Sequence, residues 1–205
     1  MSSPFLRRGL IASFAVLIGI VAGMVLLKPA ATEIRSGTML KTPRPVIDFA
    51  LNNADGRPFT KADLMGHWTV IFPGFTFCPD VCPTTLTTLR VVHEKLGDAA
   101  GKVQIVLLSV DPERDTPEKL GAYVHAFSPD FFGITGPTAQ LDPLSQSLGF
   151  VYTRVPGATP ETYTIDHSAA LIVIGPDAKL HGYFTPPYKI DALVADLRAL
   201  VAHSS

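Results

Sequence analysis

The stretch from Trp68 to Leu96 constrains the fold most, because its hydrophobic pattern changes from that of a strand to that of a helix. Trp68 to Phe72 is a short apolar run, which predicts a buried central strand. Farther on, apolar side chains recur at intervals of three and four residues, at Leu86, Leu89, Val92 and Leu96. This period predicts a helix from Pro83 to Leu96, and a strand that leads into a helix is typical of α/β folds.

The loop between this strand and this helix holds the only two cysteines of the chain, Cys78 and Cys82. Pro83 suits the first helical position, so Cys82 is predicted near the N-cap, after a tight turn that begins at Cys78. Free backbone N–H groups and the positive end of the helix dipole stabilise a thiolate there. Two such thiols can close a disulfide, bind a soft metal or supply a nucleophile, and the pair alone leaves all three open.

From Val46 onward, short apolar runs alternate with segments of helical period. Thr60 and Asp63 resemble a capping box, and Thr116 is a candidate N-cap for a helix that starts at Pro117. Further helical segments are expected around residues 142–148 and at the C-terminus. The pattern predicts an α/β fold, a sandwich of helices around a central mixed β-sheet. Strands are expected at residues 46–51, 58–60, 103–110, 131–135, 150–154, 171–174 and 179–184.

The N-terminal part differs from the rest. Gly9 to Leu27 carry no charged side chain, and about 20 apolar residues span a bilayer. Arg7 and Arg8 favour a cytoplasmic N-terminus. A cleaved signal peptide is the alternative, but its apolar core usually has only about 7 to 15 residues. We therefore expect a cytoplasmic N-terminus, a single-pass inner-membrane anchor, a flexible tether and one domain on the periplasmic side, at residues 1–8, 9–27, 28–45 and 46–205.

Composition excludes several classes of function. The chain has 205 residues, 47% of them apolar, which suffices for one well-buried domain and an appendage. Its formal net charge of −1 and its lack of a basic block argue against nucleic-acid binding. A structural zinc site needs four Cys or His ligands, and the chain has only two cysteines. Two thiolates and one imidazole, in contrast, suit Cu(I) and are acceptable to Cu(II).

His167 is the histidine whose position best suits a third ligand. It lies in the polar segment Thr164–Ser168, which is predicted to be a loop directly before the strand Ala169–Ile174. A loop at the end of the sheet can meet the cysteine turn, but spacing alone leaves a packing role equally open. The other histidines are predicted to be solvated or to pack against neighbours: His67, His93, His125, His181 and His203.

Three blocks of the sequence resemble the signature blocks of the Sco/SenC family, in the family's order. They are Phe75–Thr84, Ser109–Pro117 and Asp166–Ser168. The resemblance implies a thioredoxin-like fold and a membrane-anchored copper-binding protein that helps to build the dinuclear copper centre of cytochrome c oxidase. It also implies that Cys78, Cys82 and His167 are the metal ligands.

The aspartates of the first two blocks also match family positions. Asp80, between the cysteines, is a candidate to orient a ligand or tune the thiols, but an exposed carboxylate there can also be merely solvated. Asp111 and Asp115 match the second block, and we expect them to cap a helix and brace a loop.

The leading functional hypothesis is a copper metallochaperone without catalytic turnover, whose main partner is the copper-site subunit of the oxidase. Other periplasmic copper carriers or thiol reductants are further candidate partners. The alternative is a thiol-disulfide oxidoreductase that uses Cys78 and Cys82 to reduce the cysteines of the oxidase copper site. A peroxiredoxin-type peroxidase fits poorly, because Thr76 lies two residues before Cys78, where that motif requires three.

Overall fold

The strand predicted at Trp68 is the centre of the fold. In the computed structural model, which describes residues 34–159 and 162–203, this strand is β4 (Trp68–Gly74), and all of its residues are buried. It pairs in parallel with β5 (Val103–Ser109) and antiparallel with β9 (Leu171–Ile174). The mixed sheet expected from the sequence is therefore confirmed.

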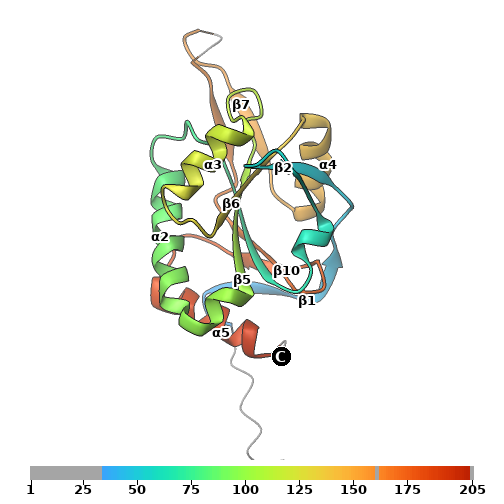
Figure 1. Ribbon diagram of the computed structural model, residues 1–205, viewed down its shortest axis with the longest axis vertical. Coiled ribbons are helices and arrows are strands. Elements are labelled where there is room, and N and C mark those ends of the chain that lie inside the picture. Colours follow the sequence, from blue (N-terminus) through green and yellow to red (C-terminus); the bar gives the residue numbers. More distant parts are fainter. Residues whose placement is uncertain (1–33, 160–161, 204–205) are drawn as a thin grey trace, which may run out of the picture. The chain divides into compact units, whose positions relative to one another are not determined.

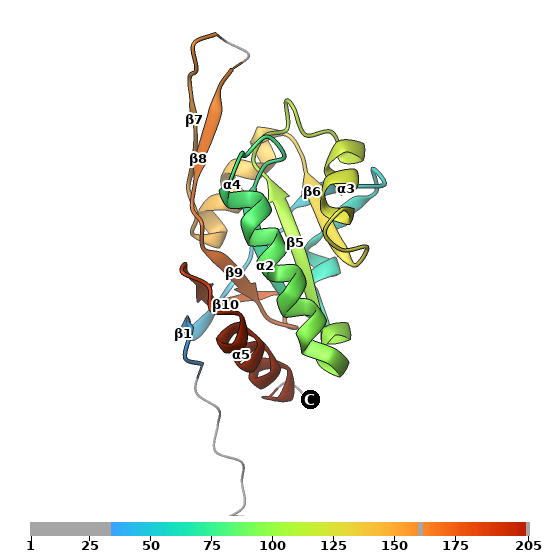
Figure 2. The ribbon, with the colours of Figure 1, turned by 90° about the vertical axis from the view of Figure 1, so that its left-hand side faces the viewer.

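Eight strands form the sheet, in the order β1-β10-β9-β4-β5-β6-β2-β3. Strands β5 and β6 are parallel, and the remaining pairs other than β4–β5 are antiparallel. Two further strands, β7 (Tyr152–Val155) and β8 (Thr164–His167), form a separate antiparallel pair, the β7–β8 ribbon. Figure 2 shows this ribbon extending past the end of the sheet. The other strands are β1 (Gly37–Pro45), β2 (Ala50–Asn53), β3 (Pro58–Thr60), β6 (Phe131–Thr135) and β10 (Lys179–Phe184).

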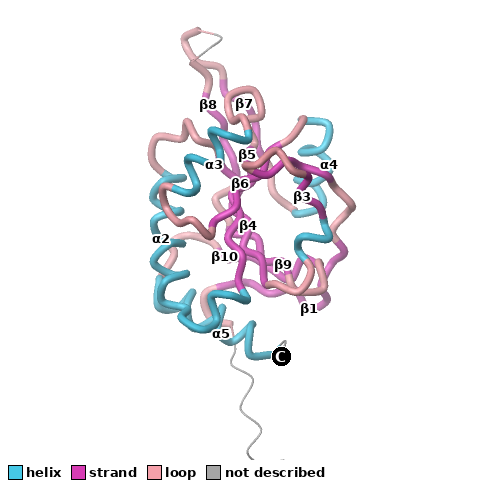
Figure 3. Tube along the Cα trace, in the orientation of Figure 1, coloured by secondary structure: helices cyan, strands magenta, loops and turns pink. Residues whose placement is uncertain are grey.

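Helices cover both faces of the sheet (Figures 1 and 3). Alternate side chains of β4 point to opposite faces of the sheet. Val70 and Phe72 pack against the helices of the first face, and Ile71 packs on the second face. The helices of the first face are α2 (Val81–Leu96), α3 (Pro117–His125) and α5 (Ile190–His203), and the second face is covered by α4 (Thr138–Leu148). Short 3₁₀ turns, η1 (Lys61–Leu64) and η2 (Gly97–Lys102), complete the elements.

Both predicted caps are confirmed. The Asp63 carboxylate accepts the Thr60 N–H at 2.7 Å, and the Thr60 hydroxyl accepts the Ala62 N–H at 3.3 Å. At α3, the Thr116 hydroxyl accepts the Lys119 N–H at 3.4 Å, with Pro117 at the first position. Local side-chain chemistry therefore sets where these elements begin.

The helix after the cysteines begins earlier than predicted. Its N-cap is Asp80 and its first residue is Val81, so Cys82 lies inside the first turn. The Thr84 N–H donates to the Asp80 carbonyl at 3.2 Å, which is the first helical hydrogen bond. Pro83 is tolerated as the third helical residue because the first N–H groups of a helix have no intrahelical acceptor. Pro143 likewise lies inside α4, which starts four residues before the predicted position.

Two segments predicted as irregular are strands. Thr164–His167, predicted as a polar loop, is β8, which pairs with β7. The predicted tether, residues 28–45, does not extend to Pro45, because Gly37–Pro45 form β1 at the edge of the sheet, paired with β10. The folded domain thus begins before Val46. The predicted anchor, residues 9–27, lies outside the described residues, and in the described part of the chain no helix is long and apolar enough to cross a membrane.

A buried carboxylate holds the chain where it leads into β1. Asp196 of α5 is 2% exposed. Its oxygens accept the Arg35 N–H at 3.1 Å, the Ser36 N–H at 2.7 Å and the Ser36 hydroxyl at 2.5 Å. These bonds join the C-terminal helix to the segment that precedes the first strand.

We therefore predict that Asp196→Asn lowers the free energy of unfolding by about 1–3 kcal/mol, because a buried amide NH₂ would face N–H donors in place of an accepting oxygen. The urea midpoint measures this change. Asp191→Asn, on the same helix, is the matched control: its exposed carboxylate pairs with Lys95, and its midpoint should stay at the wild-type value. Equal losses in both variants would contradict the special role of Asp196.

Candidate metal centre

The two cysteines lie on either side of the start of α2. Cys78 lies in the loop after β4 and is half-buried, whereas Cys82, in the first turn of the helix, is 0% exposed. The Cys82 N–H donates to Cys78 Sγ at 3.4 Å. Both side chains are free thiols. The helix start thus places the Cys78 sulfur within hydrogen-bonding distance of a backbone donor.

A glycine at the end of β4 makes room for the buried sulfur. A Cβ on Gly74 would lie 3.0 Å from Cys82 Sγ and 2.9 Å from Leu107 Cδ1. Because real Cβ atoms rarely approach their neighbours so closely, a side chain at this position would displace the sulfur or the core beside it. The strand therefore has to end on glycine for Cys82 to pack against it.

His167 is the last residue of β8, and it reaches the cysteines from a distant part of the chain. Its Nε2 lies 3.6 Å from Cys82 Sγ, and its Nδ1 lies 3.1 Å from the Ser168 carbonyl oxygen. A carbonyl only accepts, so Nδ1 carries the proton and Nε2 keeps its lone pair on the cysteine side. The rings of Phe72 and Phe75 contact the imidazole edge-on, with centroids 6.0 and 5.9 Å away.

Burial keeps the Cys82 thiol and the His167 imidazole neutral before a metal binds. Desolvation raises the pKa of the Cys82 thiol far above its ordinary value, and the neighbouring Cys78 raises it further. Desolvation also lowers the pKa of His167, so its imidazole is uncharged at neutral pH. A bound cation would reverse the balance at Cys82, because metal binding displaces the thiol proton.

The donor set fits a soft transition metal. The Sγ atoms of Cys78 and Cys82 and one ring nitrogen of His167 lie within 4.8 Å of one another. Metal bonds of about 2.3 Å to sulfur and 2.0 Å to nitrogen, the values known for zinc, place two ligands about 3.5 Å apart at a tetrahedral angle. The Cys82 to His167 distance of 3.6 Å matches this separation. In the described part of the chain this is the one group of at least three His, Cys, Asp or Glu side chains arranged to hold a metal ion.

The remaining candidates lie outside this group. Asp80 is exposed, and its carboxylate accepts the Thr84 hydroxyl at 3.4 Å, so its role in tuning the thiols stays a prediction. Other histidines have other contacts: His67 with the Met65 carbonyl, His93 with the Phe131 ring, His181 with Asp177 and His203 with the Ala199 carbonyl, while His125 is exposed.

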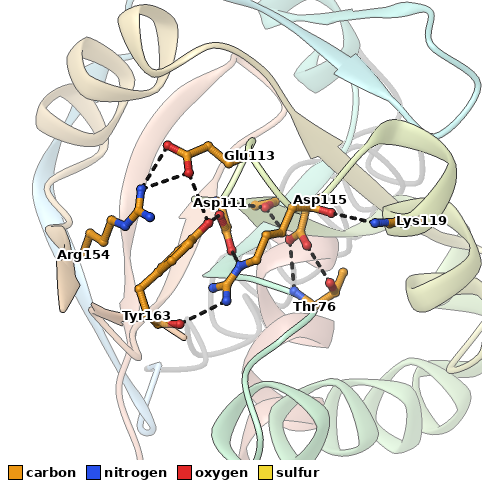
Figure 4. A network of polar contacts seen from close by, with 9 residues as sticks. Thr76, Asp111, Glu113, Asp115, Lys119, Arg154 and Tyr163 are labelled. Atoms are coloured by element: carbon orange, nitrogen blue, oxygen red, sulfur yellow. Dashed lines mark hydrogen bonds and ion pairs between the residues drawn. The ribbon is translucent and has the colours of Figure 1, made fainter. Parts of the chain in front are cut away.

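Buried aspartates after β5 brace the loop that carries Cys78. Asp115 is 0% exposed and accepts the Thr76 N–H at 3.0 Å and the Thr76 hydroxyl at 2.5 Å (Figure 4). The Ser109 hydroxyl also donates to it, at 2.6 Å. Asp111 accepts the Tyr163 hydroxyl at 2.6 Å. The loop bracing expected of these aspartates is present, whereas the cap of α3 belongs to Thr116.

Sequence reasoning missed the partners of this network. The Tyr163 ring lies between two guanidinium groups, those of Arg114 and Arg154. Tyr163 and Arg154 belong to segments that show no motif. Arg114 carried a signal, because it stands next to Asp115 and three residues after Asp111, and a buried carboxylate requires a donor.

Comparisons with known proteins place the chain in a family. The SCO1/SenC family model matches residues 38–202. The mouse mitochondrial protein SCO2 homolog is 35% identical over 157 residues, which cover 76% of this chain and 62% of the mouse protein.

Two solved structures share both sequence and fold. ScoI of Bradyrhizobium japonicum, solved with copper bound, is 33% identical with a TM-score of 0.70, and the match covers 76% of this chain and 99% of that one. Apo Sco1 of Thermus thermophilus is 38% identical with a TM-score of 0.75, covering 83% and 99%. The thioredoxin-like fold implied by the sequence is thereby confirmed. This chain belongs to the SCO1/SenC family.

Proposed function

We propose that this protein binds copper through Cys78 Sγ, Cys82 Sγ and His167 Nε2 and delivers it to the dinuclear copper centre of cytochrome c oxidase. One observation carries the proposal: two thiols and an imidazole that presents its lone pair converge within 4.8 Å. Thiolate sulfur is the ligand that Cu(I) prefers, and imidazole extends the set to Cu(II). The copper-bound ScoI of Bradyrhizobium japonicum supports the choice of metal.

The arrangement suits transfer as well as binding. Three ligands leave the copper below its maximum coordination, so a thiolate or imidazole of a recipient can join before a ligand of this protein leaves. Cys78 is half-buried, in contrast to the fully buried Cys82, so exchange would begin at the Cys78 side. The recipient is the copper-site subunit of the oxidase, and the anchor expected at residues 9–27 would hold the domain beside it at the periplasmic face of the membrane.

We predict that His167→Ala weakens Cu(II) binding by at least about tenfold, or about 1.4 kcal/mol, because it removes the only nitrogen ligand of the three. A Cu(II) titration followed through the thiolate-to-copper absorption band measures the loss. His125→Ala, an exposed histidine on α3, is the matched control and should bind as wild type does. Unchanged affinity and spectrum in His167→Ala would remove His167 from the site, and copper retained at the wild-type level by Cys78→Ser would sink the copper site itself.

A second function has support from the same pair. Reduced Cys78 and Cys82 can reduce an acceptor disulfide, such as that of the oxidase copper site. The Cys78 thiolate attacks one acceptor sulfur and forms a mixed disulfide, while the other acceptor sulfur leaves as a thiolate. Cys82 then attacks Cys78 Sγ, which releases the second acceptor thiol and leaves a Cys78–Cys82 disulfide. Two electrons pass to the acceptor, and the difference in exposure assigns the first attack to Cys78.

This mechanism predicts that Cys82→Ser accumulates a mixed disulfide on Cys78 when the protein meets a peptide disulfide, because the resolving thiol is absent. Cys78→Ser should form none, since Cys82 is fully buried. Mass spectrometry of the intact protein counts the adducts. If wild type binds Cu(I) tightly and Cys82→Ser forms negligible adduct, copper delivery would remain as the sole function.

A further inference from the structure

The ligands of the proposed copper site come from two segments that lie just beyond the ends of β4 and β9, which are paired in the main sheet. Cys78 and Cys82 share one short segment, whose geometry is set by the start of α2. His167 lies 85 residues after Cys82, at the end of the β7–β8 ribbon, which is a sheet of its own. The β4–β9 pairing brings the two segments together, and side-chain contacts beyond these strands fix the position of the imidazole against the thiols.

Arg114 contacts both parts. Its guanidinium carbon lies 4.8 Å from the ring centroid of Phe77 and 5.7 Å from that of Phe75, two rings of the cysteine loop, residues 75–80. The same carbon lies 3.7 Å from the ring centroid of Tyr163, and Arg114 Nη1 donates to the Tyr163 carbonyl at 3.0 Å. Tyr163 directly precedes β8, the strand that ends at His167. One cation thus bridges the two ligand-bearing segments.

The bridge is held rigidly. Arg114 is 18% exposed, and its Nε donates to Asp111 Oδ2 at 2.5 Å. The other oxygen of Asp111 accepts the Tyr163 hydroxyl at 2.6 Å, so one buried carboxylate fixes both the guanidinium and the ring that it covers. Cation–π attraction within about 6 Å of a ring is stronger where water is excluded, as it is at the buried rings of Phe75 and Tyr163.

The bridge also reaches the imidazole through a shared ring. Phe75, which Arg114 contacts, packs edge-on against His167 at a centroid distance of 5.9 Å. Only arginine can donate hydrogen bonds and stack on a ring with the same planar group, its guanidinium. Lysine has a compact ammonium group without a flat face.

We propose that Arg114 is the positioning residue that holds His167 against the cysteine pair. The proposal rests on the copper site described above. Arg114 itself touches neither sulfur nor imidazole; it acts through Phe75 and Tyr163. Its loss should therefore resemble a partial loss of His167 and should affect the thiols less, because the bond from the Cys82 N–H to Cys78 Sγ sets their spacing locally.

The test compares Arg114→Met and Arg114→Lys with wild type in the full chain. Arg114→Met should weaken Cu(II) binding by about 10- to 100-fold, the usual range when a residue that orients a metal ligand is lost, and should move the absorption band toward that of His167→Ala. Cu(I) affinity, measured by competition with a chelator, should change far less, because the two thiolates remain. Arg114→Lys should fail to restore Cu(II) binding although it keeps the charge.

Arg154→Met is the matched control. The guanidinium carbons of Arg154 and Arg114 lie 3.6 and 3.7 Å from the same ring centroid, so they must lie on opposite faces of Tyr163. Arg154 pairs with Glu113 at 2.9 Å, and both side chains are largely exposed. Its loss should leave the Cu(II) spectrum at the wild-type form. An equal effect of Arg154→Met, or a parallel fall of Cu(I) and Cu(II) affinity in Arg114→Met, would overturn the proposal in favour of a general role in folding.

A readout without metal separates this proposal from the proposed function. In copper-free protein, nuclear Overhauser contacts between the rings of His167 and Phe75 should be strong in wild type and lost in Arg114→Met, while thermal unfolding remains cooperative. Contacts that persist in Arg114→Met would overturn the positioning role, whatever the copper results. If the contacts disappear in Arg114→Met while wild type binds no copper, the role of Arg114 is upheld and copper binding is rejected.

Discussion

The contact between Cys82 Sγ and His167 Nε2 is the constraint on which the rest of the site depends. Both groups are polar; Cys82 is fully buried in the core and His167 is partly buried beside it. A charged group would be costly there, and burial accordingly shifts the pKa of each toward its neutral form. The fold can therefore keep a metal-binding pair inside its packed interior, because charge appears on the sulfur only when a cation arrives to balance it.

A loop that carries ligands but no regular hydrogen bonds needs support from elsewhere, and buried carboxylates provide it. Asp115 satisfies the backbone and hydroxyl of Thr76, while Asp111 holds Arg114 and Tyr163 on the ribbon side. Each carboxylate is nearly inaccessible to solvent, so each depends on these donors in turn. The segment after β5 thus braces the cysteine loop on one side and the β7–β8 ribbon on the other.

The sequence predicted the elements that depend on a local pattern. It did not predict the elements and contacts that depend on partners far away in the chain. Strong apolar runs and caps such as Thr116 were sufficient for the central strands and for α3. The segment Thr164–His167 reads as polar because the ribbon buries little, so its pairing with β7 leaves no strong alternation in the sequence. Gly37–Pro45 similarly contains two prolines, which an edge strand tolerates and a periodicity argument rejects. The cysteine pair could be found from its place between strand and helix, whereas His167 was selected by family resemblance and Arg114 only by geometry.

The division of the ligands between two supports has a consequence for the proposed transfer of copper. Moving Cys82 would disturb α2 and the buried packing against Gly74 of the main sheet, and Cys78 Sγ is tied to the helix by the Cys82 N–H. Moving His167 requires a shift of the ribbon, which has its own hydrogen bonds, including those of Ser168 with Val151, and is held to the body by side-chain packing and by the Arg114 bridge. The imidazole is therefore fixed less directly by the main sheet than Cys82 is. Two thiolates without the imidazole suit Cu(I), and the full set is also acceptable to Cu(II), so a shift of the ribbon would change which oxidation state the proposed copper site favours.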